Sequence, residues 1–404
     1  MYDINKIRQD FPILSRRVND VPLVYLDSGA SAQKPKIVLQ KIEDIYKNHY
    51  ANIHRGLHFL SNEATLLYEE ARTKVQKFLN AQRDHEIIFT KNATEAINLV
   101  SYSWGFDNLT RDDEIILTVM EHHANIIPWH FLREKLGVKL IFANVDENGN
   151  LLLDDIKKLV TNKTKLIAFT HMSNVLGTIT PVKDICAYAK SKNIATLVDG
   201  SQAVVHMSVD VTEINCDWYV FTGHKLYGPT GIGVLYAKED KLKQMRPFLG
   251  GGDMVDIVSQ THVTYNKLPH KFEAGTPPFV EAIALATAID YLSELSYDAI
   301  MKHETEITNY AYNKLSQLEN INFLGRATNK GSIIAFNINN IHAQDLAMFL
   351  DKYGVAIRAG NHCAQPLLSF FNISSVCRAS FGLYTNHNDI DHFVNSLNKI
   401  KGFF

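Results

Sequence analysis

This chain has few cysteines, almost no net charge and no long apolar run. It has 4 cysteines in 404 residues, and no two of them form a Cys-x-x-Cys pair. So small a number excludes a disulfide framework and favours a reducing compartment such as the cytoplasm. No apolar run is long enough to span a bilayer, and the first residues lack the apolar core of a signal peptide. We therefore expect a cytoplasmic protein with no membrane partner.

The charge balance and the motif content exclude further classes of protein. The formal net charge of −2 gives no electrostatic reason to expect nucleic acid as a partner. The glycine-rich segment 228–233 is not a dinucleotide fingerprint, because its spacing differs and it leads into a strand-like run. Two adjacent histidines, His122 and His123, rarely turn both rings to one ion, and no nearby acids or thiols complete a ligand set. We expect no metal site.

What the sequence does contain is a regular alternation of helix-like and strand-like segments. Short β-branched runs separated by helices indicate an α/β fold with a mainly parallel sheet covered on both faces. The expected strands cover residues 86–90, 114–118, 165–170, 194–198, 218–221 and 234–236. The expected helices cover residues 36–50, 62–80, 93–103, 152–160, 181–192 and 281–296.

The length of the chain favours two domains. A chain of 404 residues exceeds the size at which one hydrophobic core stops growing. From about residue 283 the pattern gives a long helix, a strand at 332–336, and helices near 343–353 and 387–401. We therefore divide the chain into an N-terminal segment 1–25 that packs on the small domain, a large domain 26–282 and a small α/β domain 283–404.

Lys225 is the most informative residue of the sequence. It follows the strand-like run 218–221, and Asp199 ends the apolar run 194–198. A pyridoxal phosphate enzyme requires such a pair, because a lysine amine bonds the cofactor's aldehyde and a carboxylate keeps the pyridine nitrogen protonated. An acid after an apolar run is costly to bury without a cationic partner, and a protonated ring nitrogen is one.

Further polar residues follow neighbouring strands, where ligands bind in open α/β sheets. Asn92 with Glu95 three residues later resembles a capping signature, which predicts a helix N-terminus able to bind phosphate, with Thr94 adding a hydroxyl. His122 could stack on a planar cofactor or relay protons. Asn174 could donate to the cofactor's phenolic oxygen.

Three more residues complete this set. Gln202 lies one short loop after Asp199 and could reach the same ring, and Thr222 and His224 flank the turn before Lys225. Each candidate alone has an ordinary alternative: a capped helix, a surface or core histidine, or a turn residue. Their order at successive strand ends favours one cofactor site.

Cys363, in the segment Arg358-Ala359-Gly360-Asn361-His362-Cys363-Ala364, indicates which pyridoxal reaction is carried out. A buried structural cysteine is the alternative, and it is the reading we adopt for Cys186 and Cys216. The polar, glycine-containing surroundings of Cys363 argue against burial, and nearby His362 and Arg358 would favour a thiolate. The sequence therefore predicts an enzyme that takes sulfur from cysteine.

Ordered motifs along almost the whole chain carry a family resemblance. They begin at 26–30 (LDSGA) and 52–56 (NIHRG), continue through the cofactor segments, and include 272–277 (FEAGTP), 358–364 and 377–381 (CRASF). The chain resembles SufS-type cysteine desulfurases, within the class V aminotransferase superfamily. The resemblance implies the fold type I of pyridoxal phosphate-dependent transferases, with a large domain built on a mainly parallel seven-stranded sheet flanked by helices and a small C-terminal domain carrying Cys363.

The resemblance also implies residue roles. The expected catalytic residues are Lys225, Cys363 and His122, the last stacked on the cofactor ring. The expected cofactor-binding residues are Thr94, Asn174, Asp199, Gln202, Thr222, His224, Lys225 and Thr276, the last from the partner subunit of a homodimer. The expected substrate-binding residues are Arg378, as the carboxylate clamp, with Asn174, His54, Arg55 and Arg358.

The implied reaction converts L-cysteine to L-alanine and leaves its sulfur as a persulfide on Cys363. The short connection around Cys363 cannot travel far, so we expect a SufE-like or SufU-like acceptor protein to approach it, in iron–sulfur cluster assembly. Asn361 stands where many relatives have a second histidine. Selenocysteine lyase, cysteine sulfinate desulfinase and aminotransferase activities remain alternatives, as does a non-catalytic scaffold, which retention of Lys225 and Cys363 argues against.

Overall fold

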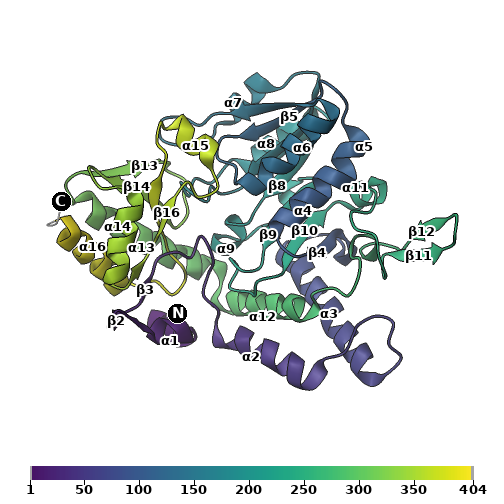
Figure 1. Ribbon diagram of the computed structural model, residues 1–404, viewed down its shortest axis with the longest axis horizontal. Coiled ribbons are helices and arrows are strands. Elements are labelled where there is room, and N and C mark those ends of the chain that lie inside the picture. The colour runs from purple at the N-terminus through teal and green to yellow at the C-terminus, as the bar shows by residue number, and fades with distance from the viewer. Residues whose placement is uncertain (1, 402–404) are drawn as a thin grey trace.

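A seven-stranded mixed sheet forms the centre of the protein. The computed structural model describes residues 2–401 and places this sheet between two layers of helices (Figure 1). In spatial order its strands are β4 (Ile87–Thr90), β10 (Gly233–Ala237), β9 (Trp218–Thr222), β8 (Ala195–Asp199), β7 (Thr164–Thr170), β5 (Glu114–Thr118) and β6 (Lys139–Ala143). The strands from β9 to β6 pair in parallel, whereas β10 is antiparallel to both of its neighbours. The predicted α/β class and the mainly parallel seven-stranded sheet are confirmed.

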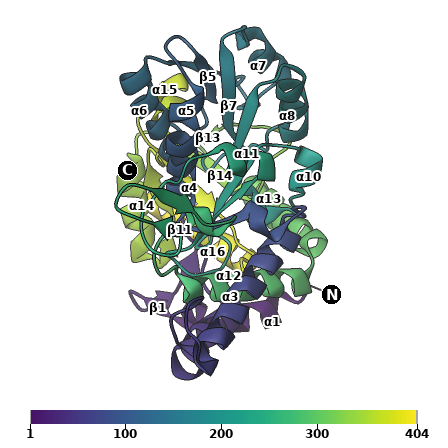
Figure 2. The same cartoon turned by 90° about the vertical axis from the view of Figure 1, so that its right-hand side faces the viewer.

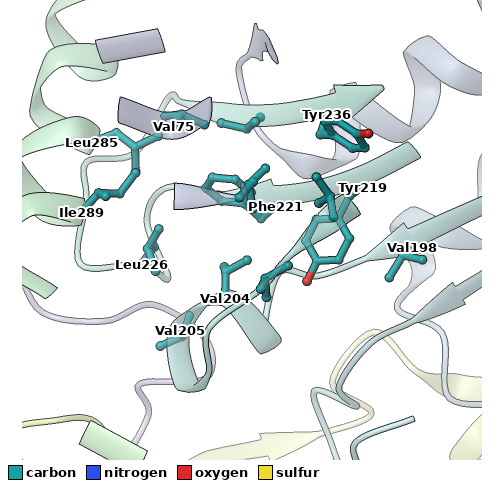
Figure 3. Packing of buried hydrophobic residues seen from close by; sticks show 14 of the residues in the cluster. Val75, Val198, Val204, Val205, Tyr219, Phe221, Leu226, Tyr236, Leu285 and Ile289 are labelled. Carbon is teal, nitrogen blue, oxygen red and sulfur yellow. The ribbon is translucent and has the colours of Figure 1, made fainter. Parts of the chain in front are cut away.

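Alternate side chains of the central strands enter different cores, as the two-residue period of a strand requires. In β9, Tyr219 and Phe221 belong to one buried cluster, and Trp218 and Val220 belong to another. Figure 3 shows the first cluster, in which Phe221 of β9 lies near side chains of helices on the same face. Because both faces are covered, β8, β9 and β10 are buried along their whole length.

The helices of this part of the chain cover both faces of the sheet and its edges (Figures 1 and 2). They are α2 (Lys36–Asp44), α3 (Phe59–Phe78), α4 (Ala93–Val100), α5 (Phe106–Asn108), α6 (Ile127–Leu136), α7 (Leu153–Leu159), α8 (Val182–Ser191), α9 (Ala203–His206), α10 (Val211–Ile214), α11 (Glu239–Gln244) and α12 (Phe279–Leu295). A hairpin of β11 (Val255–Val258) and β12 (Val263–Tyr265) projects from the right of the molecule in Figure 1.

A second, four-stranded sheet lies in the C-terminal part of the chain. Its strand order is β13 (Ile321–Leu324), β14 (Ile333–Ile338), β17 (Val376–Ser380) and β16 (Arg358–Gly360), all antiparallel. Its helices are α13 (Tyr297–Ser316), α14 (Ala343–Lys352), α15 (Gln365–Phe370) and α16 (His387–Lys401). A separate hydrophobic cluster that includes Phe336 and Phe393 joins this sheet to α14 and α16.

The N-terminal segment lies against this C-terminal part (Figure 1). It contains α1 (Ile4–Gln9), β1 (Arg17–Val18), β2 (Val21–Pro22) and β3 (Val24–Tyr25). β3 pairs in parallel with β15 (Val355–Ala356), and Arg8 forms an ion pair of 2.6 Å with Asp389. The division into 1–25, 26–282 and 283–404 stays a prediction; α12, which spans the proposed boundary at 283, packs against α3 and α2.

Several expected boundaries differ from the structure. Several elements were not predicted, among them β6, α6, α13, β13 and β17. The expected helix 36–50 is α2 followed by a π-helical turn, Ile45–His49. The remaining predicted helices and strands agree with the structure to within a few residues, the variation that element ends normally show. Among the described residues no helix is long and apolar enough to cross a membrane.

Candidate active site

A cavity of about 300 Å³ opens at the carboxyl ends of the parallel strands. Residues from both sheets contribute to it, from Thr94 on α4 to Arg378 on β17. Of the predicted site residues, the following eleven line it: Thr94, His122, Asn174, Asp199, Gln202, Thr222, His224, Lys225, Arg358, Cys363 and Arg378. The fold thus brings together side chains that are up to 284 positions apart in the sequence.

Lys225 and Asp199 enter the cavity from adjacent strands. Asp199 ends β8 and is 7% exposed, and one of its carboxylate oxygens accepts a hydrogen bond of 3.0 Å from the Ser201 N–H. Lys225 follows β9, and burial lowers the pKa of its amine to about 8, against the opposing effect of Asp199. About a tenth of the amine is therefore unprotonated at pH 7, far more than in an ordinary lysine, and the unprotonated form is the one that acts as nucleophile or base.

The N-terminus of α4 forms one end of the cavity. The Asn92 side chain accepts a hydrogen bond of 2.9 Å from the Glu95 N–H, which confirms the predicted cap and leaves the preceding N–H groups facing outward. Thr94 lies in this first turn, and Thr222 lies opposite with its buried hydroxyl oxygen unpaired among the described residues. Free N–H groups, hydroxyls and the helix dipole together suit a phosphate group.

Gly233 allows α4 to approach the sheet this closely. A Cβ atom at this position would lie 2.4 Å from the carbonyl carbon of Asn92 and 2.9 Å from the backbone nitrogen of Ala93. Contacts with backbone atoms cannot be relieved by rotating a side chain, so residue 233 must be glycine. The glycine-rich segment 228–233 therefore has a packing role, because Gly233 lets the N-terminus of α4 lie close to the sheet.

His122 presents a neutral ring to the cavity. Burial, with a smaller effect of Lys225, lowers the pKa of its imidazole to about 4. Its Nδ1 accepts a hydrogen bond of 3.1 Å from the Ala124 N–H, so the proton of the neutral ring resides on Nε2. A neutral ring with this fixed tautomer can stack on a planar ligand and can donate from Nε2.

Gln202 and Asn174 are both buried and both hold backbone groups of other segments. The amide nitrogen of Gln202 donates to the Gly29 carbonyl at 2.7 Å, while its amide oxygen is unpaired among the described residues. The amide nitrogen of Asn174 donates to the His362 carbonyl at 2.9 Å. Asn174 therefore connects the strand-end loop after β7 to the loop that carries Cys363.

Arg378 is almost completely buried and is held by two partners. Its Nη1 donates to the Asn174 carbonyl at 2.8 Å, and its Nη2 lies 3.1 Å from a carboxylate oxygen of Asp27. Arg358, which is half exposed, lies 2.9 Å from the other oxygen of the same carboxylate. The Nε of Arg378 is buried and unpaired among the described residues, so this N–H is available to a substrate carboxylate.

Cys363 is exposed and lies on a tight turn between β16 and α15. Both His362 (φ 52°) and Cys363 (φ 55°) have left-handed backbone conformations. The Asn361 side chain accepts from the Cys363 N–H at 3.0 Å, and the Asn361 carbonyl accepts from the Ala364 N–H at 2.9 Å. The side chain and the backbone carbonyl of Asn361 thus both stabilise the turn, which gives Asn361 a structural role in presenting the thiol.

His362 does not carry the positive charge that the sequence reading assigned to it. Its Nε2 donates to the Val376 carbonyl at 2.8 Å, and its Nδ1 is buried and unpaired among the described residues. Burial, with a smaller effect of Arg378, lowers the pKa of this imidazole to about 4. The ring is therefore neutral near pH 7, and Lys225, Arg358 and Arg378 are the cations of the cavity.

Two residues that the sequence reading left without a role have contacts at the site. The His123 N–H donates to the Cys363 carbonyl at 2.7 Å, and its ring accepts from the Gln365 N–H at 3.4 Å. Asp27 holds both Arg378 and Arg358. Asp27 lies in the quoted segment 26–30, directly before Ser28 and Gly29. An acid beside a serine and a glycine was the one available signal in the sequence.

Three predicted site residues do not line the cavity of the single described chain. His54 lies 3.3 Å from Glu69, Arg55 pairs with Asp253 at 2.9 Å, and Thr276 is exposed on the loop before α12. The roles of these three stay predictions. His54, Glu69 and His270 have ligand atoms within 4.8 Å of one another, and the Glu69 carboxylate also lies 2.9 Å from Arg72.

The residues of the cavity fit pyridoxal phosphate. The helix end with Thr94 and the unpaired Thr222 hydroxyl suits the phosphate, and Asp199 suits a protonated pyridine nitrogen. Lys225 provides the amine, and His122 provides a flat neutral ring beside it. The unpaired amide oxygen of Gln202 shows that the cavity also has hydrogen-bonding capacity that no protein group uses.

Comparison with known proteins decides the family. Residues 24–393 match the family described as Aminotransferase class-V. The chain belongs to this family. A cysteine desulfurase of Yersinia pseudotuberculosis serotype O:1b (strain IP 31758) is 48% identical over 401 residues, covering 99% of this chain and 98% of that protein. A cysteine desulfurase of Yersinia pestis (strain Pestoides F) is similar to the same extent.

Solved structures of class V aminotransferase relatives agree with the fold. The cysteine desulfurase CsdA (S-sulfonic acid) from Escherichia coli superposes with a TM-score of 0.93 at 35% identity, covering 100% of both chains. The apo cysteine desulfurase from Thermococcus onnurineus NA1 gives a TM-score of 0.93 at 36% identity, with 98% of each chain covered. The predicted family and the predicted fold are confirmed.

Proposed function

We propose that this class V aminotransferase-family protein is a cysteine desulfurase that converts L-cysteine to L-alanine and retains the sulfur on Cys363. The observation that carries the proposal is that one cavity contains both a buried lysine beside an aspartate and an exposed cysteine that forms no disulfide among the described residues. The full-length similarity to cysteine desulfurases supports it. An aminotransferase needs no such thiol at its site.

Pyridoxal phosphate, held by Lys225, Asp199, Thr94, Thr222 and His224, would supply the sink for the electron pair released at the substrate's α-carbon. Each of these residues lines the cavity. His224 is neutral near pH 7, because burial lowers the pKa of its imidazole to about 4. It can therefore accept or donate a hydrogen bond near the phosphate without adding a further charge.

Arg378 would bind and orient the substrate carboxylate. The bonds to Asn174 and Asp27 fix the orientation of the guanidinium and leave its Nε unpaired among the described residues, so the group is preorganised for the substrate. Arg358 also pairs with the Asp27 carboxylate and lies on the more exposed side of it. With the carboxylate fixed, Lys225 can take the α-proton with its neutral amine, whose pKa burial lowers to about 8.

Cys363 would then attack the substrate sulfur. The bond between that sulfur and the substrate's β-carbon breaks, its electron pair stays with the carbon fragment, and a sulfur–sulfur bond forms to Cys363. Protonation of the fragment gives alanine, and His122, with its proton on Nε2, is placed to act as a donor. One thiol and one cysteine thus become one persulfide and one alanine, without an external oxidant.

The acceptor of the persulfide sulfur would be a separate protein of the SufE-like or SufU-like kind, within iron–sulfur cluster assembly. The thiol is exposed but its turn is fixed by Asn361 and by the His123 N–H, so it cannot reach far from the cavity. An acceptor thiol must therefore approach Cys363. The assignment to the SufS subtype rests on the same short connection around Cys363. The cytoplasm is a reducing compartment and would keep Cys363 and the other three cysteines free of disulfides.

The protein would act as a homodimer. Large apolar side chains are exposed at the start of α3 and on the β11–β12 hairpin, including Leu57 (99% exposed), Phe59 (76%) and Val258 (66%). An exposed apolar surface of this kind marks an interaction site. Thr276, which lies outside the cavity of its own chain, would reach the phosphate of the partner's cofactor.

The test is to incubate the purified, cofactor-loaded protein with L-cysteine and a thiol reductant and to measure alanine and sulfide. Equal amounts of both products are expected, and protein in which Cys363 is alanine should release neither. Pyruvate with ammonia, or amino-group transfer to a keto acid, would contradict the proposal. L-selenocysteine assayed in parallel separates a desulfurase from an enzyme that prefers the selenium substrate.

A further inference from the structure

Glu121 is a carboxylate in the protein interior, one position before His122. It is 0% exposed and does not line the cavity. Burial raises the pKa of its carboxyl to about 8, even though three hydrogen bonds act in the opposite direction. A buried acid of this kind lowers stability relative to an apolar residue of similar size, so stability alone does not account for it.

Glu121 joins the ends of two strands to the turn that follows them. One carboxylate oxygen accepts from the Thr118 hydroxyl at 2.6 Å, on β5, and from the Thr170 N–H at 3.1 Å, at the end of β7. The other oxygen accepts from the Asn125 side-chain amide at 2.7 Å. The Thr170 N–H and the Asn125 NH₂ group can only donate, and they do so to different oxygens. A glutamate carboxyl, ionised or protonated, is the side chain of this size in which both oxygens can accept.

The orientation of Asn125 makes this requirement strict. The Asn125 amide oxygen accepts a hydrogen bond of 3.1 Å from the Trp129 indole N–H, so its NH₂ group must face Glu121. A glutamine at position 121 would direct its own NH₂ group either toward that of Asn125 or toward the Thr170 N–H, which is also a donor. One of the two donors would then be buried without an acceptor.

The turn that Glu121 holds carries contacts to both halves of the site. His122 lines the cavity from this turn, and Thr170 lines it from β7. The next residue, His123, donates its N–H to the Cys363 carbonyl at 2.7 Å. The turn 121–125 is thus a common support for the imidazole of His122 and for the loop of the reactive thiol.

We propose that Glu121 is a positioning residue that fixes the turn 121–125 and, through it, the distance between the cofactor site and the Cys363 thiol. The inference rests on the desulfurase function proposed above. Loss of Glu121 should slow the transfer of sulfur to Cys363 and leave the binding of cofactor and L-cysteine largely intact, because Arg378 is held by other contacts and Lys225 follows a different strand, β9.

The experiment compares cofactor-loaded wild-type protein with Glu121→Gln in a single turnover with L-cysteine. The expected result is a 10- to 100-fold slower formation of alanine and of persulfide on Cys363, with a KM for L-cysteine within about twofold and an unchanged cofactor absorbance band. Glu304→Gln is the matched control, because Glu304 is an equally buried acid, paired with His206 at 2.7 Å and outside the cavity. That control should keep the wild-type rate.

A second variant tests the hydrogen-bond argument directly. In Glu121→Gln with Asn125→Asp, the new aspartate accepts both from the glutamine amide and from the Trp129 N–H, so the turn is restored and the rate should return to within about threefold of wild type. A wild-type rate in Glu121→Gln, or a loss that the double change does not recover, overturns the inference.

If the Glu121→Gln protein does not fold, Asn125→Ala is tested in its place. This change removes one of the three hydrogen bonds to Glu121 and keeps the Glu121 side chain. The rate of persulfide formation should then fall several-fold with KM unchanged, and an unchanged rate overturns the inference. Wild-type protein that makes no alanine contradicts the proposed function instead, so the two failures are distinguishable.

Discussion

Arg378 and Asp27 form an ion pair of 3.1 Å in which the arginine side chain is only 2% exposed. They lie 351 positions apart in the sequence, on β17 and on the segment after β3. The carboxylate is shared with Arg358 on the more exposed side. Asp27 thus holds the guanidinium that would bind the substrate carboxylate.

Asp27→Asn should weaken substrate binding and stability together. The asparagine cannot balance the charge of Arg378, and removing one partner of a buried ion pair costs about 3 kcal/mol. We expect the KM for L-cysteine to rise about tenfold while the cofactor absorbance is retained. Urea unfolding and steady-state kinetics measure the two effects.

Asp154→Asn is the control for this change. Asp154 pairs with Lys157 at 2.9 Å on the surface of α7, with a side chain 74% exposed, so its loss should leave stability nearly unchanged. Equal effects of the two substitutions on KM would contradict the role given to Asp27.

Gly233→Ala should impair cofactor binding. The new Cβ would lie 2.4 Å from the Asn92 backbone and would displace the N-terminus of α4 from the phosphate position. We expect the dissociation constant for pyridoxal phosphate to rise at least tenfold, measured by the absorbance of the bound cofactor. Gly252→Ala, where no atom lies within 4 Å of the added Cβ, should bind as wild type does.

Much of the fold was predictable because the central strands are apolar along their length. The runs at 114–118, 165–170 and 194–198 match β5, β7 and β8 to within a residue, since each is buried on both faces. β6 was missed because it is an edge strand that begins with an exposed lysine. The predicted helix 281–296 agrees with α12, but α13 begins directly after Ser296 and was missed.

The site was predictable where residues act from the ends of strands, and not where they act through another residue. Asp199 ends β8 and Lys225 follows β9, so their position alone indicates a shared edge of the sheet. Asp27, Glu121 and His123 are different, because their importance depends on contacts with Arg378, Asn125 and Cys363. No local pattern encodes those pairings.

The buried amine of Lys225 should make the stability of the cofactor-free protein depend on pH. Its pKa is lowered to about 8 from 10.5, so the unfolded chain binds this proton more readily between pH 8 and 10.5. Stability from this group therefore rises with pH across that window and is lowest below pH 8. Lys225→Met removes the effect.

At pH 7 the cofactor-free Lys225→Met protein should exceed wild type by about 3 kcal/mol in free energy of unfolding. At pH 10 most of this difference should disappear. Urea unfolding at both pH values measures it, and a difference that is the same at pH 7 and pH 10 would show that the amine is not desolvated.

Cys363 should be the one thiol that reacts rapidly in the native protein. It is exposed, whereas Cys186, Cys216 and Cys377 are buried, and burial raises the pKa of the Cys186 and Cys377 thiols to about 12. Only a thiolate attacks a disulfide reagent at a useful rate, and the reagent cannot reach a buried thiol.

Native protein should therefore release one equivalent of chromophore per chain from an aromatic disulfide reagent, and denatured protein four. Cys363→Ser should release none before denaturation and three after it. One fast equivalent remaining in that variant would show that a different cysteine is accessible, and the persulfide would then have to be located by mass spectrometry before any role is given to Cys363.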